Sequence, residues 1–254
     1  MRARVIAWAA ALAVSIAPAA ARAQAAPGGV PDITGSWERY GGILSQRADV
    51  RRDDPTFPPP APPPPLRPAY RQEWQARVQA AREADAKGTP LASNATTCLP
   101  EGMPAMMAAI FPMEILQSRG QVTIIEEAFT QVRRILMDQP QKPIDDVEPG
   151  FYGRSVGRWD GDTLVVETVG VKENVRFQNT SHSKDMRIAE RMHLVSPNIL
   201  WNEITITDPV TLEKPWTLVY AYRRMPGYTL LEYVCEDNRE FAEQGLQKST
   251  LGKK

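Results

Sequence analysis

Both histidines of the 254-residue chain fall in one short stretch, SHSKDMRIAERMHL, residues 181–194. His182 follows the polar sequence RFQNTS, so we expect it in a loop at the mouth of a folded sheet, where it could act as a proton shuttle. His193 lies eleven positions later, inside an expected strand. Because the two side chains take different faces and no third ligand has a suitable spacing, the stretch does not predict a metal site.

Glu190 is the residue of this stretch that breaks the strand pattern. Alternation along a strand places it with Ile188 and Met192, while Arg191 and His193 take the other face. Burying an unpaired carboxylate is costly. Three arrangements stay open: Glu190 pairs with an arginine, it faces a wet ligand cavity, or a β-bulge turns it outward.

Two further strands place charge on an apolar face. Glu126 shares a face with Ile124, and Arg134 shares one with Val132 and Leu136. Arg134 is therefore the arginine that we expect to reach an inward carboxylate.

A cofactor-independent lyase or isomerase is the catalytic hypothesis that follows. Glu190 would be its general acid or base, Arg134 or Arg191 would hold an anionic group or developing charge, and a tyrosine would donate a hydrogen bond. This hypothesis predicts that Glu190→Gln abolishes turnover and leaves thermal stability nearly intact. The residues assigned to catalysis are Glu190, His182, Arg191 and Arg134.

The expected ligand is a small apolar or aromatic molecule. The chain holds six tryptophans and seven tyrosines, several of them on strand faces, which suits such a ligand. In 199–207 the alternation leaves open whether Trp201 and Glu203 or Asn202 and Ile204 face inward. The candidate ligand contacts are Glu126, Trp201, Glu203, Trp216, Tyr220 and Tyr222.

Several classes of protein are disfavoured by absent motifs and by charge. The sequence has no G-x-S-x-G, P-loop, G-x-G-x-x-G or C-x-x-C-H motif, so we expect no cofactor and no metal. The formal net charge is zero, so we expect no nucleic-acid partner. A small molecule is the expected partner, and the oligomeric state is open.

The N-terminus has the pattern of a secretory signal peptide. A short basic start, an apolar run and the small-residue sequence ARA predict cleavage after residue 23, export to the periplasm and no membrane insertion after cleavage. The only two cysteines, Cys98 and Cys235, then predict one disulfide. For a loop of this length the chain-entropy model gives about 4–5 kcal/mol as an upper figure.

The rest of the chain predicts an all-β fold, a lipocalin-like antiparallel up-and-down barrel with a short N-terminal helix. A proline tract and a helix that starts at Pro68 and ends near Gly88 come before a series of short strands with explicit turns such as Asp160-Gly161. Met103, Met106, Met107 and Met113, in and just after the segment 96–112, could line an apolar pocket or fill the core. We favour a role in the core.

We expect six parts along the chain. The first three are the signal peptide (1–23), a leader (24–56) that holds the first strand near 32–42, and an exposed proline-rich connector (57–67). A helix and loop that pack on the barrel follow (68–112), then the main part of the barrel (113–238) with its last strand at 229–236, and finally a C-terminal tail (239–254).

Several motifs resemble a family of uncharacterised exported bacterial proteins of the sphingomonad and acidobacterial type. They are CLPEGMP, EILQSRGQVTIIEEAFTQVRRILMD, GRSVGRWDGDTLVVETVG, HSKDMRIAERMHL, ITITDPVTLEKPWTL and EYVCEDN, in order over residues 32–238. The resemblance places weight on His182, Glu190 and Arg191 and implies no established mechanism. This chain departs from the family pattern at DQPQKP (138–143) and at Arg154, where the family carries histidine.

Two alternatives to an enzyme stay open. A non-catalytic lipocalin-like carrier would bind a hydrophobic compound and release it unchanged. A structural or interaction protein that uses the proline tract would have a barrel filled by side chains.

Overall fold

A computed structural model describes residues 29–44, 57–89 and 91–235 of the chain. The predicted signal peptide (1–23) and C-terminal tail (239–254) lie outside the described residues, as do residues 24–28 and 45–56 of the predicted leader. No helix in the described ranges is long and apolar enough to cross a membrane.

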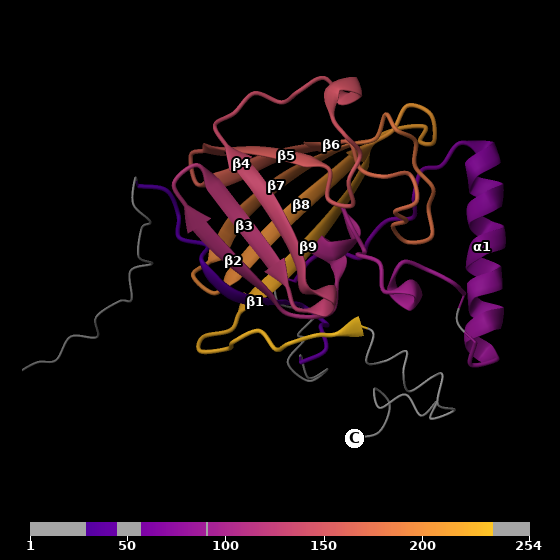
Figure 1. Ribbon diagram of the computed structural model, residues 1–254, viewed down its shortest axis with the longest axis horizontal. Coiled ribbons are helices and arrows are strands. Elements are labelled where there is room, and N and C mark those ends of the chain that lie inside the picture. The colour runs from indigo at the N-terminus through magenta and orange to yellow at the C-terminus, as the bar shows by residue number, and fades with distance from the viewer. Residues whose placement is uncertain (1–28, 45–56, 90, 236–254) are drawn as a thin grey trace, which may run out of the picture.

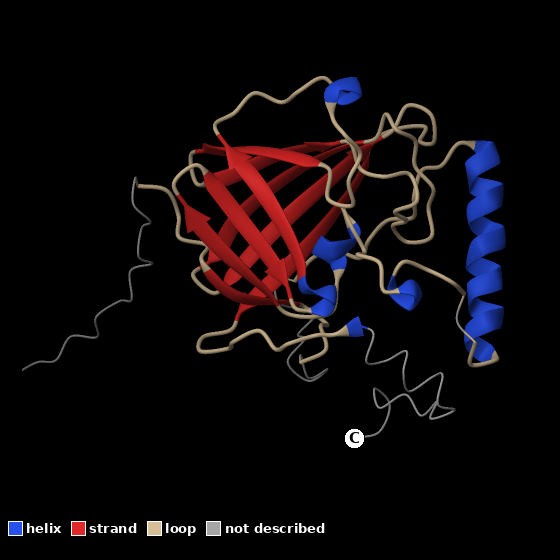
Figure 2. Ribbon diagram, in the orientation of Figure 1, coloured by secondary structure: helices blue, strands red, loops and turns tan. Residues whose placement is uncertain are grey.

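Nine strands form one closed barrel whose spatial order follows the chain order (Figures 1 and 2). The strands are β1 (Gly35–Arg39), β2 (Met113–Ser118), β3 (Gln121–Glu126), β4 (Gln131–Met137), β5 (Arg154–Asp160), β6 (Thr163–Val169), β7 (Arg187–Ser196), β8 (Ile199–Thr207) and β9 (Trp216–Arg224). The helices are α1 (Pro68–Ala86) and the short 3-10 turns η2 (Ala95–Thr97), η3 (Ala105–Ala108), η4 (Ala128–Thr130) and η5 (Ile144–Asp146). The predicted β-barrel is confirmed.

One neighbouring pair of strands is parallel, so the prediction of uniform antiparallel pairing is wrong. Strand β4 pairs with β5 in parallel, Ile135 opposite Ser155 and Met137 opposite Gly157, while β1 and β9 close the barrel antiparallel. The reason is that nine is an odd number. In a closed ring with an odd number of strands, not every strand can be antiparallel to both of its neighbours, and here β4 and β5 are the parallel pair. The long connection 138–153 carries the chain back to make this possible.

The described residues of the predicted strand at 229–236, residues 229–235, form no strand and lie in a strap on the outside of the barrel. Strand β9 is already paired on both sides, by β8 and β1, so the closed sheet offers no edge to a further strand. The chain after β9 instead crosses below the barrel in Figure 1. Ser36 Oγ donates to the carbonyl oxygen of Tyr228 at 2.8 Å, and the predicted disulfide Cys98–Cys235 is present. We call residues 225–235 the strap.

Helix α1 starts at Pro68 as predicted and stands beside one end of the barrel (Figure 1). It follows β1 in the chain, and none of its residues is fully buried. Tyr70 and Trp74 pack against the core, and the Trp74 indole donates to the carbonyl oxygen of Gln178 at 3.0 Å. The proline tract is partly docked rather than wholly exposed, because the Trp216 indole donates to the Pro62 carbonyl oxygen at 2.9 Å.

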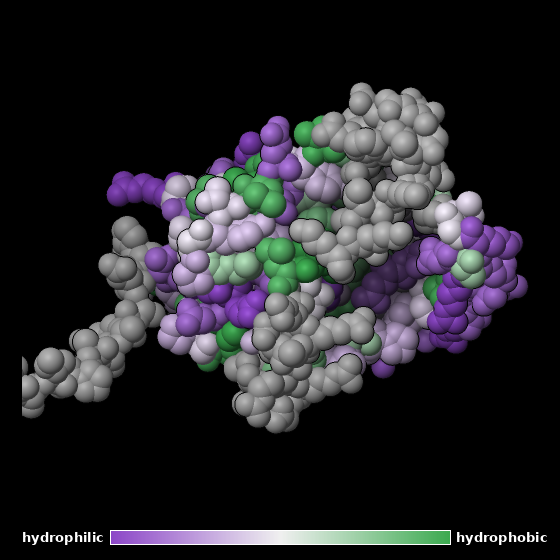
Figure 3. All heavy atoms as spheres, turned by 90° about the horizontal axis from the view of Figure 1, so that it is seen from below, coloured by the Kyte–Doolittle hydropathy of each residue, from purple (hydrophilic) through white to green (hydrophobic). Residues whose placement is uncertain are grey.

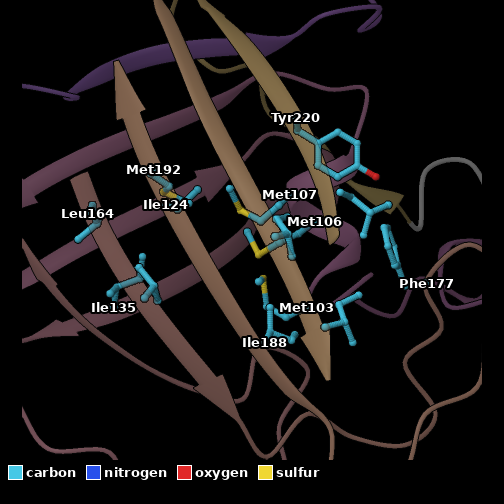
Figure 4. Close-up of a cluster of buried hydrophobic side chains, with 14 of the residues drawn as sticks. Met103, Met106, Met107, Ile124, Ile135, Leu164, Phe177, Ile188, Met192 and Tyr220 are labelled. Carbon is cyan, nitrogen blue, oxygen red and sulfur yellow. The ribbon is translucent and has the colours of Figure 1, made fainter. Parts of the chain in front are cut away.

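Side chains fill the barrel. Inward residues of the strands meet the methionines of residues 103–107, which close the end of the barrel that faces α1 (Figures 1 and 4). Met103, Met106, Met107 and Met113 are all buried, which confirms their prediction as core residues. The Tyr222 hydroxyl donates to the Met107 carbonyl oxygen at 2.5 Å and ties this segment to β9. We call this end of the barrel, with the loop 170–186, the mouth.

Candidate functional site

Glu190 faces the barrel interior as predicted, and there it meets an arginine. Arg133 Nη1 donates to Glu190 Oε1 at 3.1 Å, and Arg133 Nη2 donates to Glu190 Oε2. Both side chains are 0% exposed, so this is a fully buried, bidentate ion pair between β4 and β7. Of the three arrangements that the sequence left open, the structure has the first.

The partner is Arg133, whereas the sequence analysis chose Arg134. Both phases of VRRILM put an arginine among apolar residues, so alternation alone does not choose between them. Pairing with β3 decides, because residues directly opposite in a sheet share a face. Ile135 is opposite the buried Val122, and Arg133 is opposite the buried Ile124. Arg134 is therefore exposed on the outer face.

Neighbouring strands supply further hydrogen bonds to the ion pair. Arg133 donates from Nε to Ser155 Oγ at 3.2 Å and from Nη2 to Thr168 Oγ1 at 3.1 Å. Asn202 Nδ2 donates to Glu190 Oε1 at 2.9 Å. Strands β4 to β8 thus each contribute one polar residue to an interior network. None of the four pockets described below is lined by Glu190.

The other residues assigned to catalysis are not brought to Glu190. Arg191 lies on the outer face, where its Nη2 is 3.7 Å from Asp160 Oδ2. His182 lies in the mouth loop as predicted. Its Nδ1 is 2.9 Å from the Ser183 carbonyl oxygen and its Nε2 is 3.0 Å from the Lys172 carbonyl oxygen, so both ring nitrogens are engaged by the backbone.

The predicted aromatic face of β9 is inward, but it belongs to the core. Trp216, Tyr220 and Tyr222 are each at most 7% exposed, and their polar atoms contact the chain itself. In β8 the inward residues are Asn202 and Ile204, which resolves the ambiguity of that strand. Trp201 and Glu203 consequently lie on the outer face, away from the interior.

Glu126 is the predicted inward carboxyl that lacks a cation. It is 1% exposed and accepts a hydrogen bond from Gln131 Nε2 at 2.5 Å. Burial, reinforced by the nearby Glu101, raises the pKa of Glu126 to about 10. Burial and the charge of Glu126 likewise raise the pKa of Tyr152 to about 12. Glu126 is therefore a neutral carboxylic acid at pH 7.

Stability is expected to fall with rising pH because of Glu126. A carboxyl whose pKa is higher in the folded chain than its ordinary 4.5 stabilises the fold below that value and loses this contribution as pH rises toward about 10. The slope is at most about 1.4 kcal/mol per pH unit. Glu126→Gln should flatten the urea-unfolding free energy between about pH 5 and about pH 9, whereas the exposed-site change Glu203→Gln should not. An unchanged slope in the Glu126 variant would show that this carboxyl is ionised.

Four pockets in the described part of the chain lie at the mouth or outside the barrel. The pocket at the mouth beside His182 and Trp216 has about 20 Å³, enough for one water molecule. A groove of about 770 Å³ lies between residues 144–149 and the mouth loop, and one of about 550 Å³ lies along β5 and β6. A fourth, of about 520 Å³, lies between α1, residues 91–97 and the mouth loop.

This fourth groove, which we call the helix groove, has polar groups that lack partners. Figure 3 shows a hydrophilic hollow between the barrel and α1. The groove is lined by Arg77 of α1, by Arg176 of the mouth loop and by Glu101, which precedes the mouth methionines. Arg77 Nε and Glu101 Oε2 are buried without a hydrogen-bond partner among the described residues. Burial raises the pKa of Glu101 above its ordinary value. Unpaired polar atoms and a shifted carboxyl pKa are typical of binding sites.

Sequence reasoning missed the helix groove. Arg77 falls on a predicted helix and Arg176 in a predicted loop, 99 positions apart, and no motif connects them. The charged groups of the 770 Å³ groove differ from those of the helix groove because they are paired with each other. Lys184 Nζ and Asp145 Oδ1, both exposed, are 3.0 Å apart.

The fold and site define a closed nine-stranded β-barrel protein with a filled interior and a polar groove beside its long helix. Neither protein-family models nor curated proteins match the chain, so the family resemblance stays a prediction. Among the described residues no three His, Cys, Asp or Glu side chains are grouped to hold a metal ion.

Proposed function

We propose that this protein is an exported, non-catalytic binding protein whose ligand lies in the helix groove. The barrel is the rigid scaffold, and α1 and the mouth loop supply the ligand contacts. The observation that carries this proposal is the pair of buried, unpartnered polar atoms, Arg77 Nε and Glu101 Oε2, in a groove large enough for a small molecule. These atoms show that the side chains lining the groove have hydrogen-bonding capacity that the described residues leave unused.

The polar lining changes the expected chemistry of the ligand. A lipocalin-like carrier would hold an apolar or aromatic compound inside the barrel, against residues such as Trp216 and Tyr220. Those side chains are buried in the core, and the ion pair of Arg133 and Glu190 occupies the interior beside them. A small polar molecule in the helix groove fits the lining better.

Export to the periplasm is part of the proposal. The N-terminal sequence supports it, and so does the disulfide between Cys98 and Cys235, since such bonds persist in oxidising compartments.

Blocking the helix groove is expected to abolish binding. Ala81 lines the groove from α1, whereas Ala76 is exposed on the same helix and does not line it. Binders from a fragment library of sugars, hydroxy acids, amino acids and aromatic compounds can be found by NMR titration. Ala81→Trp should weaken their binding by at least about tenfold, and the matched control Ala76→Trp should leave it unchanged.

Two outcomes would contradict the proposal. One is a binder that tolerates Ala81→Trp, which places the site elsewhere. The other is a library without any binder, which favours the structural or interaction role that a filled barrel also supports. Such a role would use the exposed part of the proline tract, residues 59–63.

A further inference from the structure

The helix groove brings two guanidinium groups to one carboxylate. Arg77 Nη2 is 3.7 Å from Glu73 Oε1, and Arg176 Nη1 is 3.6 Å from the same oxygen. Both distances exceed those of a good charge-assisted hydrogen bond, so neither arginine has a close bidentate partner there. One carboxylate balances one of the two positive charges and leaves the other without a counter-charge at this point of the groove.

The two arginines also retain free donors. A guanidinium group has five N–H donors. Arg176 Nη1 donates to Ser181 Oγ at 2.5 Å, while Arg77 Nε is buried and donates to no described residue. Burial and the nearby Arg77 lower the pKa of Arg176, which means that the two cations repel each other in a partly desolvated place. An anion between them would relieve this repulsion.

Two carboxyls, Glu101 and Asp85, line the groove together with the arginines. Burial raises the pKa of Glu101 above its ordinary value, and a hydrogen bond with the Gln131 side chain opposes this rise. Glu73 is engaged by both arginines and by the Ser181 hydroxyl, which donates to it at 2.9 Å. Asp85 lies about two helical turns beyond Arg77 on α1.

We propose that the helix groove takes a small anionic molecule, with a carboxylate or phosphate group between Arg77 and Arg176. The side-chain amides of Asn174 and Asn179, which also line the groove, suit hydroxyl groups on the rest of the molecule. This inference rests on the proposed function, since it names the ligand class of the same groove.

Matched probes separate charge from shape. D-Glucuronate differs from D-glucose by a carboxylate in place of a hydroxymethyl group, and inorganic phosphate tests the anion alone. In NMR titrations of the oxidised protein, glucuronate or phosphate should shift the amide resonances of residues around Arg77 and Arg176. Glucose should bind at least about tenfold more weakly than glucuronate. Preference for glucuronate indicates a carboxylate site, and preference for phosphate a phosphate site.

A matched pair of variants ties the binding to the groove. Arg77→Gln should weaken binding of the anionic probe by roughly tenfold or more, while Arg82→Gln, an exposed arginine on the same helix, should have no effect. Added salt should weaken binding, because the groove is open to solvent. Thermal unfolding of both variants checks that the fold is intact.

The outcomes distinguish the two levels of the proposal. Equal binding of glucose and glucuronate, with both sensitive to Ala81→Trp, would overturn the anionic ligand and keep the binding groove. Anion binding that survives Arg77→Gln would overturn the arginine pair. No shift with either anion would overturn the inference, whatever the fragment library shows for neutral compounds.

Discussion

Glu190→Gln is expected to lower the free energy of unfolding by about 3–5 kcal/mol, since it leaves the Arg133 guanidinium buried without a counter-charge. Both groups are 0% exposed, so water cannot compensate for the loss. Urea unfolding at pH 7 measures the effect. The catalytic hypothesis drawn from the sequence expects the opposite result, lost turnover with nearly intact stability.

A double variant separates the cost of an unpaired charge from that of lost packing. Arg133→Met together with Glu190→Leu removes both charges and keeps apolar volume, and buried ion pairs replaced in this way are often neutral. We therefore expect the double variant to regain more than half of the stability that Glu190→Gln loses. The exposed-site change Arg134→Gln should stay within about 0.5 kcal/mol of the unchanged protein. A Glu190→Gln variant as stable as the parent would refute the charge-pair assignment.

Removing the disulfide is expected to cost up to about 4–5 kcal/mol by the chain-entropy model, because the bond closes a loop of 137 positions. The bond also joins two segments that lie outside the sheet. Cys98 precedes the methionines at the mouth, and Cys235 ends the strap. The strap is otherwise attached by contacts such as those of Glu127 Oε2, which accepts from the Tyr228 hydroxyl at 2.7 Å and from the Leu231 N–H at 2.8 Å.

The measurement is urea unfolding of Cys98→Ser/Cys235→Ser beside the unchanged protein, each with and without a thiol reductant. The reductant should destabilise the unchanged protein to the level of the variant and leave the variant as it is. Equal stability of all four samples would mean that mouth and strap are held without the bond.

Local alternation was enough for the strands whose two faces differ clearly. In β7, Ile188, Glu190 and Met192 face inward as predicted, and the aromatic face of β9 is inward as well. The same rule failed in β4, where adjacent arginines make both phases equally plausible and only pairing with β3 chooses Arg133. Alternation also did not decide which face of β8 is inward. The structure shows that Asn202 is inward, because its side chain contacts Glu190.

The sequence by itself determined the β-barrel class, helix α1, the disulfide and the apolar strand faces that Glu126 and Glu190 share. These features depend on residue types and on spacing within one element, which a chain carries locally. The tertiary structure decided what each inward charge meets, where the barrel has its parallel pair, and that α1 and the mouth loop form a groove. These depend on register, on parity around a closed ring and on contacts between distant segments. Arg133 and Glu190 are 57 positions apart, and no local pattern states that their side chains meet.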